Sequence, residues 1–273
     1  YARMLKAIKI TAPAQAGDGD DAAVREGATS GLAAYGFGNL RVEMNGREVT
    51  DLEWRSEKSK EMFFFFLCNR RPLRKEEIVN ALWPDLSDGK TSSLFHSNLY
   101  RLRQALYPEC IAKQSGRYVL DPQGSFRFDV EAFDQTVKEA DSLPPEGDEA
   151  ISLMEKARAV HTGPFASEFY SEWAETLRWQ LEEQHMRLLT TLAGAYTARG
   201  EYKRSADLCQ QILSVDDYNE AAWYRLMSNY ILADQMEAAA FCYRKYADIV
   251  SEGLGGDDIP EFEEICSQIA SRR

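Results

Sequence analysis

Apolar side chains recur at intervals of four and three residues within the stretch at residues 90–107. On a helix that turns by about 100° per residue, they form one narrow stripe that has to pack on another element. The stripe consists of Phe95, Leu99, Leu102 and Leu106. The opposite face is polar, carries no acid, and consists of Ser93, His96, Ser97, Tyr100, Arg101 and Gln104. Solvated helix faces ordinarily mix acids and bases, so this face favours a polyanionic partner; an amphipathic core helix with a polar face is the alternative.

The beginning of this helix has the groups that bind anions. Lys90, Thr91 and Ser92 supply one ammonium and two hydroxyl groups. The first turn of a helix also offers unpaired backbone N–H groups and the positive end of the helix dipole. The sequence therefore predicts a phosphate-binding site at this helix start.

The elements around this helix follow a definite order. Residues 40–49 alternate apolar and polar side chains around an Asn-Gly pair, which is the strongest short signal for a β-hairpin. Two helices are predicted next, at residues 55–69 and 74–83. After the helix at 90–107, residues 111–120 predict a second hairpin with basic side chains near its tip. A sheet, three helices and a basic hairpin form the plan of a winged helix-turn-helix.

Residues 55–121 resemble the winged-helix DNA-binding domain of bacterial response regulators, in the version found in antibiotic-regulatory activators. The resemblance rests on RKEEIV followed by Leu82-Trp83, on RLRQAL at residues 101–106, and on SGRYVLD at 115–121. It implies that the third helix enters the major groove of DNA and that the wing touches the backbone or the minor groove. It also implies that the loop at residues 84–89 faces RNA polymerase.

The second half of the chain is predicted to be helical, with an internal period of 34 residues. Tyr196 and Ala206 recur as Tyr230 and Ala240, and the small alanines would let paired helices approach closely. The period resembles the tetratricopeptide repeat. Its two copies lie at residues 185–217 and 219–251. Further helices are predicted at residues 129–140, 149–161, 173–199 and 261–269, the last after a loop at 253–260.

From residue 128 onward the chain resembles the bacterial transcriptional activator domain family over essentially its whole length. The residues that carry the resemblance are Asp129-Val130-Glu131-Ala132-Phe133, Gly163-Pro164-Phe165, Trp173, Gly200-Glu201-Tyr202, Glu220, Leu226-Met227, Leu254-Gly255 and Ile259-Pro260. A winged helix followed directly by this domain is a characteristic pair. It implies a transcription regulator, usually an activator that recruits RNA polymerase.

We therefore predict an α+β winged helix-turn-helix domain at residues 35–127 and an all-α, tetratricopeptide-like domain at residues 128–273. Residues 1–34 are expected to be the remnant of an upstream element and a flexible linker rich in Ala, Gly and Asp. The net charge of −12 is unevenly divided. Residues 52–121 hold twelve basic and nine acidic side chains, whereas residues 129–273 hold thirteen and twenty-eight. The first domain can thus meet phosphate while the acidic one stays away from it.

The sequence offers little that enzyme chemistry would need. No Gly-rich phosphate loop of the usual spacing occurs, and the three histidines lie in separate segments. We therefore expect no enzymatic role, no cofactor and no metal site. The five cysteines are odd in number and lack a Cys-x-x-Cys motif, which argues against disulfides and fits a reducing cytoplasm. No apolar run approaches the ~18 residues that span a membrane.

Sequence-specific binding of double-stranded DNA is the first functional hypothesis. Base edges would be read by Ser93, His96, Ser97, Tyr100, Arg101 and Gln104. Phosphates would be bound by Lys90, Thr91, Ser92, Arg103, Lys113, Ser115 and Arg117.

Two alternatives remain open. The helical half can be a protein-binding scaffold, with the winged helix degenerate or used for protein contacts. Trp173, Trp179 and Trp223 are then candidate groove residues, although core packing is the simpler explanation for each. The helical half can instead bind a small-molecule or protein effector, or a second copy of the chain, and so gate DNA binding. A homodimer on tandem half-sites is an expectation by analogy alone.

Overall fold

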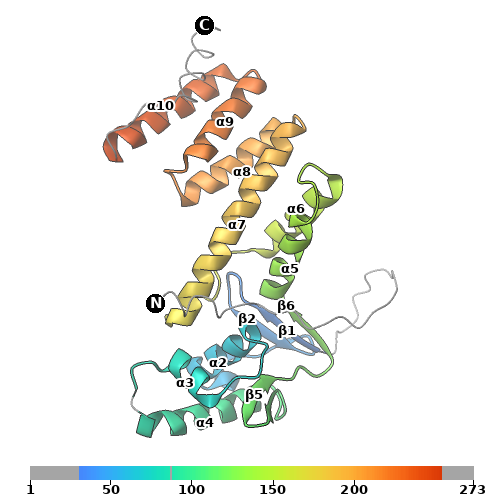
Figure 1. The fold of residues 1–273 in the computed structure, drawn as a ribbon, viewed down its shortest axis with the longest axis vertical. Helices are drawn as coiled ribbons and strands as arrows, with labels where there is room; N and C mark the ends of the chain where they lie inside the picture. Colours follow the sequence, from blue (N-terminus) through green and yellow to red (C-terminus); the bar gives the residue numbers. More distant parts are fainter. Residues whose placement is uncertain (1–30, 87, 254–273) are drawn as a thin grey trace. The chain divides into compact units, whose positions relative to one another are not determined.

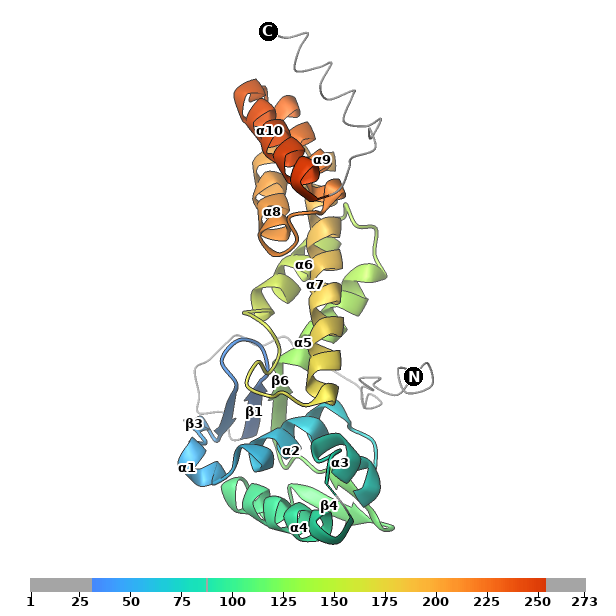
Figure 2. The same ribbon diagram turned by 90° about the vertical axis from the view of Figure 1, so that its left-hand side faces the viewer.

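A computed structural model describes residues 31–86 and 88–253 of the chain (Figures 1 and 2). These residues form two compact units. The first comprises the chain up to Gln135 together with Val160–Glu182, and the second comprises Thr136–Ala159 and the chain from Glu183 onward. This division does not coincide with the boundary predicted between residues 127 and 128, because a segment of the helical half packs into the first unit.

Within the described part of the first unit, a mixed four-stranded sheet has the strand order β3-β2-β1-β6. The strands are β1 (Gly31–Tyr35), β2 (Arg41–Met44), β3 (Arg47–Glu48) and β6 (Ser125–Phe128). β1 pairs antiparallel with β2 and parallel with β6, and β2 pairs antiparallel with β3. The first predicted hairpin is confirmed, since Asn45 and Gly46 both have the positive φ that its two-residue turn requires.

The prediction that residues 31–34 belong to a flexible linker is wrong, because they form most of β1. Leu32, Ala33 and Ala34 are buried. Small residues suit this strand: a Cβ placed on Gly31 would collide with the backbone carbonyl group of Ser125 in the neighbouring β6. The scarcity of large side chains here therefore marks a close approach between strands and not an absence of structure.

The helices of the winged-helix part are α1 (Asp51–Trp54), α2 (Glu57–Cys68), α3 (Lys75–Leu82) and α4 (Asp88–Ala105). The helix predicted at residues 55–69 is confirmed as α2, with Ser56 at its N-cap position. Phe63, Phe64 and Phe66 of α2 have no exposed surface. Because α2 contacts α1, α3 and α4, it forms the centre of the core of this unit.

The second predicted hairpin is confirmed as β4 (Ile111–Gln114) and β5 (Arg117–Leu120), which pair antiparallel. Ser115 and Gly116 at its tip have φ angles of 50° and 78°, as a tight two-residue turn requires. β5 is tied to the segment before α3 by two backbone hydrogen bonds of 2.8 Å between Leu73 and Tyr118. The hairpin is thereby attached beside the helices as a wing.

The segment Val160–Glu182 belongs to the first unit. Trp173 meets Phe65 of α2 edge-on, with ring centroids 5.3 Å apart. The guanidinium group of Arg178 holds the preceding loop by donating hydrogen bonds to the carbonyl oxygens of Phe165, Ala166 and Phe169. The core around α2 therefore includes residues that the sequence pattern assigned to the helical domain.

The described part of the second unit is helical. It draws on α5 (Asp129–Asp141), α6 (Asp148–Val160), α7 (Glu172–Ala198), α8 (Tyr202–Val215), α9 (Glu220–Leu232) and α10 (Met236–Gly253). α5 and α7 also contribute residues to the first unit. The predicted helix pairs are confirmed, with Ala206 and Ala240 both buried. The loop predicted at residues 253–260 and the helix at 261–269 lie outside the described residues. None of the described helices is long and apolar enough to cross a membrane.

The turns of the two repeats are equivalent. Gly200 follows α7 with a φ of 75°, and Asp234 follows α9 with a φ of 58°. In each turn, the next backbone N–H group donates back across the helix end, from Glu201 to Tyr196 at 2.9 Å and from Gln235 to Tyr230 at 2.7 Å. Asp234 thus adopts the left-handed conformation that usually favours Gly at a helix end.

Candidate nucleic-acid interface

The apolar stripe of α4 is buried, as the sequence predicts. Phe95, Leu99, Leu102 and Leu106 all lie in the core. The helix packs on α1 and α2, and the Phe95 ring meets that of Tyr118 in the wing edge-on, at a centroid distance of 5.0 Å. The opposite face of α4 consequently points away from the core of the unit.

A polar residue on the buried side of α4 was not anticipated. Asn98 is 3% exposed. Its Oδ1 atom accepts a hydrogen bond of 3.0 Å from the hydroxyl group of Ser56, and its Nδ2 atom donates to the carbonyl oxygen of Leu94 at 2.9 Å. Ser56 is the N-cap residue of α2. This buried, hydrogen-bonded pair therefore fixes α4 against the start of α2.

The predicted base-reading residues share the outer face of α4. Five of them are exposed, namely Ser93, His96, Ser97, Tyr100 and Gln104, and Arg101 is half-buried. Tyr100 leaves 60% of its surface exposed. Figure 2 shows α4 beside β4 of the wing, so the two elements present neighbouring surfaces.

The start of α4 differs from the prediction. The helix begins at Asp88 and not at residue 90. Thr91 therefore lies inside the helix and is buried, which does not support its predicted role as a phosphate ligand. Ser92 is exposed and accepts a hydrogen bond of 2.7 Å from Nζ of Lys75. The side chain of Lys90 lies outside the described part of the structure.

The other predicted phosphate ligands divide into two groups. Lys113 and Ser115 are exposed at the wing tip. Arg117 is half-buried, with Nη1 3.5 Å from the carbonyl oxygen of Pro72. Arg103 is half-buried as well, and its Nη2 atom donates a hydrogen bond of 2.6 Å to the carbonyl oxygen of Ile111. The guanidinium group of Arg103 is thus engaged with the protein, which does not support its prediction as a phosphate ligand.

Lys75 is a basic residue that the sequence prediction missed. Its ammonium group lies at the start of α3, 2.7 Å from the Ser92 hydroxyl and 5.6 Å from the centre of the Phe95 ring. In the sequence, Lys75 is an ordinary charged residue in a first helical turn, 17 positions before Ser92. Only the folded arrangement, in which α3 and α4 both contact α2, brings the two side chains together.

The buried thiols show no features of a reactive site. Cys68, Cys110, Cys209 and Cys242 are free and buried. Burial raises the pKa of the Cys110 and Cys209 thiols to about 11, so they remain protonated and poorly nucleophilic near neutral pH. Within residues 31–86 and 88–253, no cluster of His, Cys, Asp and Glu side chains could hold a metal ion.

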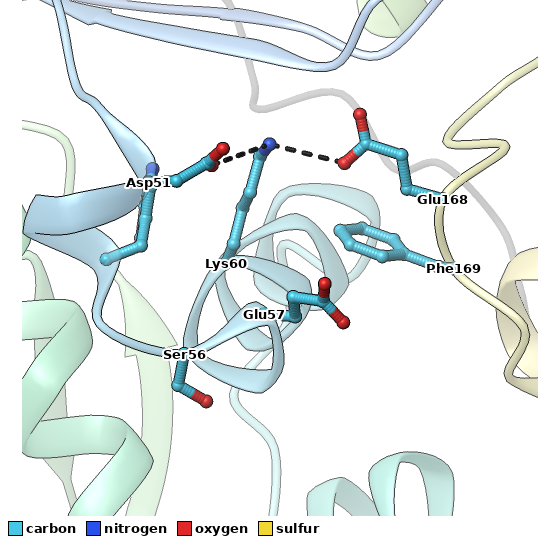
Figure 3. Close-up of a pocket in the computed structure, with 7 residues that line it drawn as sticks. Asp51, Ser56, Glu57, Lys60, Glu168 and Phe169 are labelled. Carbon is cyan, nitrogen blue, oxygen red and sulfur yellow. Dashed lines mark hydrogen bonds and ion pairs between the residues drawn. The ribbon is translucent and has the colours of Figure 1, made fainter.

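A cavity of about 310 Å³ lies between the residues of α1, the first turn of α2 and the loop that carries Glu168 and Phe169. Figure 3 shows Lys60 reaching between Asp51 and Glu168, with its Nζ atom 3.5 and 3.3 Å from their carboxylate oxygens. Ser56 also lines the cavity and donates its hydrogen bond to Asn98 of α4. The cavity thus adjoins the packed side of α4 and is separate from the acid-free outer face.

Comparison with protein families gives a match over more than half of the chain. The model of the bacterial transcriptional activator domain matches residues 128–270. Among curated proteins, the transcriptional regulatory protein MoaR1 of Mycobacterium tuberculosis is 21% identical over 254 residues, covering 88% of this chain and 80% of MoaR1.

A solved structure has a similar fold. It is Mycobacterium tuberculosis EmbR in complex with a low-affinity phosphopeptide, with a TM-score of 0.68 and 20% sequence identity. The match covers 89% of this chain but 65% of the EmbR chain, so this chain spans slightly less than two thirds of that relative. At this level of identity, the likeness establishes the fold alone.

Proposed function

Because this chain belongs to the bacterial transcriptional activator domain family, we propose that it is a sequence-specific DNA-binding transcription regulator that acts as an activator. The observation that carries the proposal is the outer face of α4, which carries no acid between Thr91 and Ala105, together with the exposed wing residues Lys113 and Ser115. A helix of this kind fits the major groove, where base edges can be distinguished by hydrogen bonding. The excess of basic side chains at residues 52–121 supports an approach to phosphate.

Base reading is proposed for Ser93, His96, Ser97, Tyr100, Arg101 and Gln104. Arg101 is the principal candidate, since a guanidinium group can donate two parallel hydrogen bonds to guanine. Arg101 is half-buried, so part of its surface remains accessible. The hydroxyl and amide groups around it can donate to or accept from neighbouring bases.

Phosphate binding is proposed for a smaller set than the sequence predicted. Lys75 at the start of α3 donates to the Ser92 hydroxyl in the first half of α4, which brings an ammonium and a hydroxyl group together, and Lys113, Ser115 and Arg117 provide donors at the wing. Lys90 remains a proposed ligand on sequence grounds. Thr91 and Arg103 are left out of the proposed set, because Thr91 is buried and Arg103 donates its hydrogen bond to the carbonyl oxygen of Ile111. Two groups of phosphate contacts would flank the base-reading face and fix its register on the duplex.

Other partners are proposed from the family resemblance. The loop between α3 and α4 would face RNA polymerase, and its Pro84, Asp85 and Leu86 are exposed. The second unit would serve homodimerisation on tandem half-sites or bind a small-molecule or protein effector. The helical half of the chain at residues 129–273 carries 13 basic and 28 acidic side chains, an acidic balance that is unsuited to phosphate contact.

The salt dependence of duplex binding tests this function. Affinity of the full chain for duplex DNA should fall steeply as salt increases, with a slope of about −0.9 for each phosphate neutralised. Replacing either Lys113 or Lys75 by Ala should make this slope less steep by about 0.9. Arg187→Ala is the matched control, because Arg187 is an exposed residue of the second unit, and it should leave the slope unchanged. Absence of binding even at low salt would contradict the proposal.

A further inference from the structure

Arg103 connects the end of α4 directly to the wing. Its Nη2 atom donates a hydrogen bond of 2.6 Å to the carbonyl oxygen of Ile111, the first residue of β4. The donor is charged, which makes such a bond shorter and stronger than a neutral one. The Nε atom of Arg103 is buried and has no hydrogen-bond partner among the described residues. The half-buried side chain of Arg103 therefore lies between the end of α4 and the start of β4.

The other strand of the wing is held by different contacts. Leu73 and Tyr118 exchange two backbone hydrogen bonds of 2.8 Å, and the Tyr118 ring packs on Phe95 of α4. These contacts fix β5, whereas the contact from Arg103 fixes the beginning of β4. The wing is consequently tied to α4 through both of its strands.

From this geometry we propose that Arg103 is a positioning residue, which sets the distance and angle between the reading face of α4 and the wing tip at Lys113. The inference rests on the proposed function, since it takes α4 and the wing to be the two elements that bind DNA. Arg103 acts through the backbone of β4 and does not itself contact phosphate. Ile111 lies two positions before Lys113 in the same strand, so movement at Ile111 is passed to the Lys113 side chain.

The contribution of the wing to DNA affinity should therefore depend on Arg103. A wing that is already fixed relative to α4 loses little freedom when it meets the duplex, whereas a loosened wing has to be ordered on binding. Lys113 can then contribute fully to DNA affinity only while Arg103 holds β4. A direct phosphate contact by Arg103 would instead contribute independently of Lys113.

A double-mutant cycle in the full chain separates these cases. Arg103→Met retains the aliphatic stem and removes the donor. We expect Lys113→Ala to weaken DNA binding by about 3–10-fold in the wild-type background and by less than about twofold in the Arg103→Met background. The control cycle pairs Arg103→Met with Ser97→Ala, whose effects should multiply, because Ser97 lies on α4 itself. Multiplicative effects of Arg103→Met and Lys113→Ala would overturn the proposal.

A second measurement, made without DNA, tests the positioning role separately from the proposed function. Hydrogen exchange of the amides at residues 111–120 should be at least about tenfold faster in Arg103→Met, while exchange in α2 stays unchanged. Arg103→Lys, which keeps a charged donor, should restore slower exchange. Unchanged exchange in Arg103→Met would overturn the inference whether or not the chain binds DNA. If exchange is accelerated in Arg103→Met but neither Arg103→Met nor Lys113→Ala changes the affinity for DNA, the result would instead count against the proposed function.

Discussion

The indole Nε1 atom of Trp173 donates a hydrogen bond of 3.1 Å to Oε1 of Glu61, and both side chains are buried. The two residues are 112 positions apart, one in α7 and the other in α2. Glu61 also forms an ion pair of 2.7 Å with Lys58, so its carboxylate is satisfied from two sides. This contact makes the beginning of α7 part of the core that supports α4.

Trp173→Ala should destabilise the first unit by about 3–5 kcal/mol, because it removes a large buried ring and leaves Glu61 without one of its hydrogen-bond donors. Urea unfolding followed by circular dichroism would measure the loss. Trp179→Ala is the matched control on the same helix, since Trp179 is 66% exposed, and its effect should stay within about 0.5 kcal/mol. Equal effects of the two substitutions would contradict this account of the core.

Several features of the fold could be predicted from the sequence because short-range patterns determine them. The buried stripe of α4, the Asn45-Gly46 turn and the Ser115-Gly116 turn each depend on residues a few positions apart. The 34-residue repeat could also be predicted, since small alanines recur at the positions where its paired helices approach each other. Of the three candidate groove residues, Trp173 and Trp223 are buried, as core packing predicts, whereas Trp179 is exposed.

Features that depend on distant contacts could not be predicted. β1 is rich in Ala and Gly because it lies close to β6, which follows it by about ninety residues, and nothing near β1 signals this. Among the candidate site residues, the sequence identified the exposed face of α4 but not the contacts that the charged residues near it make in the folded chain. Arg103 is engaged by a carbonyl oxygen that becomes its neighbour only when the wing folds back. Lys75 reaches Ser92 only once α3 and α4 have both packed on α2.

Arg101→Ala should weaken binding to the preferred operator by about 1–3 kcal/mol and relax sequence preference at one base pair. The reason is the loss of a bidentate contact to a single base, which carries both affinity and discrimination. Competition binding against operators substituted at each position would measure both effects. Uniform weakening across all sequences would indicate that Arg101 contacts phosphate and not a base.

Asn229→Ala should destabilise the second unit by about 1–3 kcal/mol. Asn229 is buried, donates to the Ser205 hydroxyl at 2.8 Å, and accepts from the Thr197 hydroxyl at 2.9 Å. The three residues lie on α9, α8 and α7, so the substitution removes the two hydrogen bonds by which Asn229 joins the hydroxyl groups of the two other helices. Thermal unfolding would measure the change, with Ser214→Ala on the exposed side of α8 as the control. A loss no larger than that of Ser214→Ala would contradict the role of this network.

Tyr196 should make the second unit sensitive to alkaline pH. Burial, followed by its hydrogen bond to Glu155, raises the pKa of the Tyr196 hydroxyl to about 12. The unfolded chain ionises this group near pH 10. The folded state therefore keeps a proton that the unfolded state loses, so stability is fully present below pH 10 and declines as pH rises towards 12. Tyr196→Phe should show a shallower decline in this range, measured by urea unfolding at several pH values; parallel declines would contradict the assignment.

The central claim, that α4 and the wing read DNA sequence, is tested most directly by selecting duplexes from a random library with the full chain at two salt concentrations. Sequencing of the bound fraction should yield one short enriched motif, and the affinity for it should fall steeply with salt. The Arg101→Ala variant should lose enrichment at one position of that motif. Binding without any enriched motif, or no binding at low salt, would contradict the claim and favour the helical second unit as the functional surface.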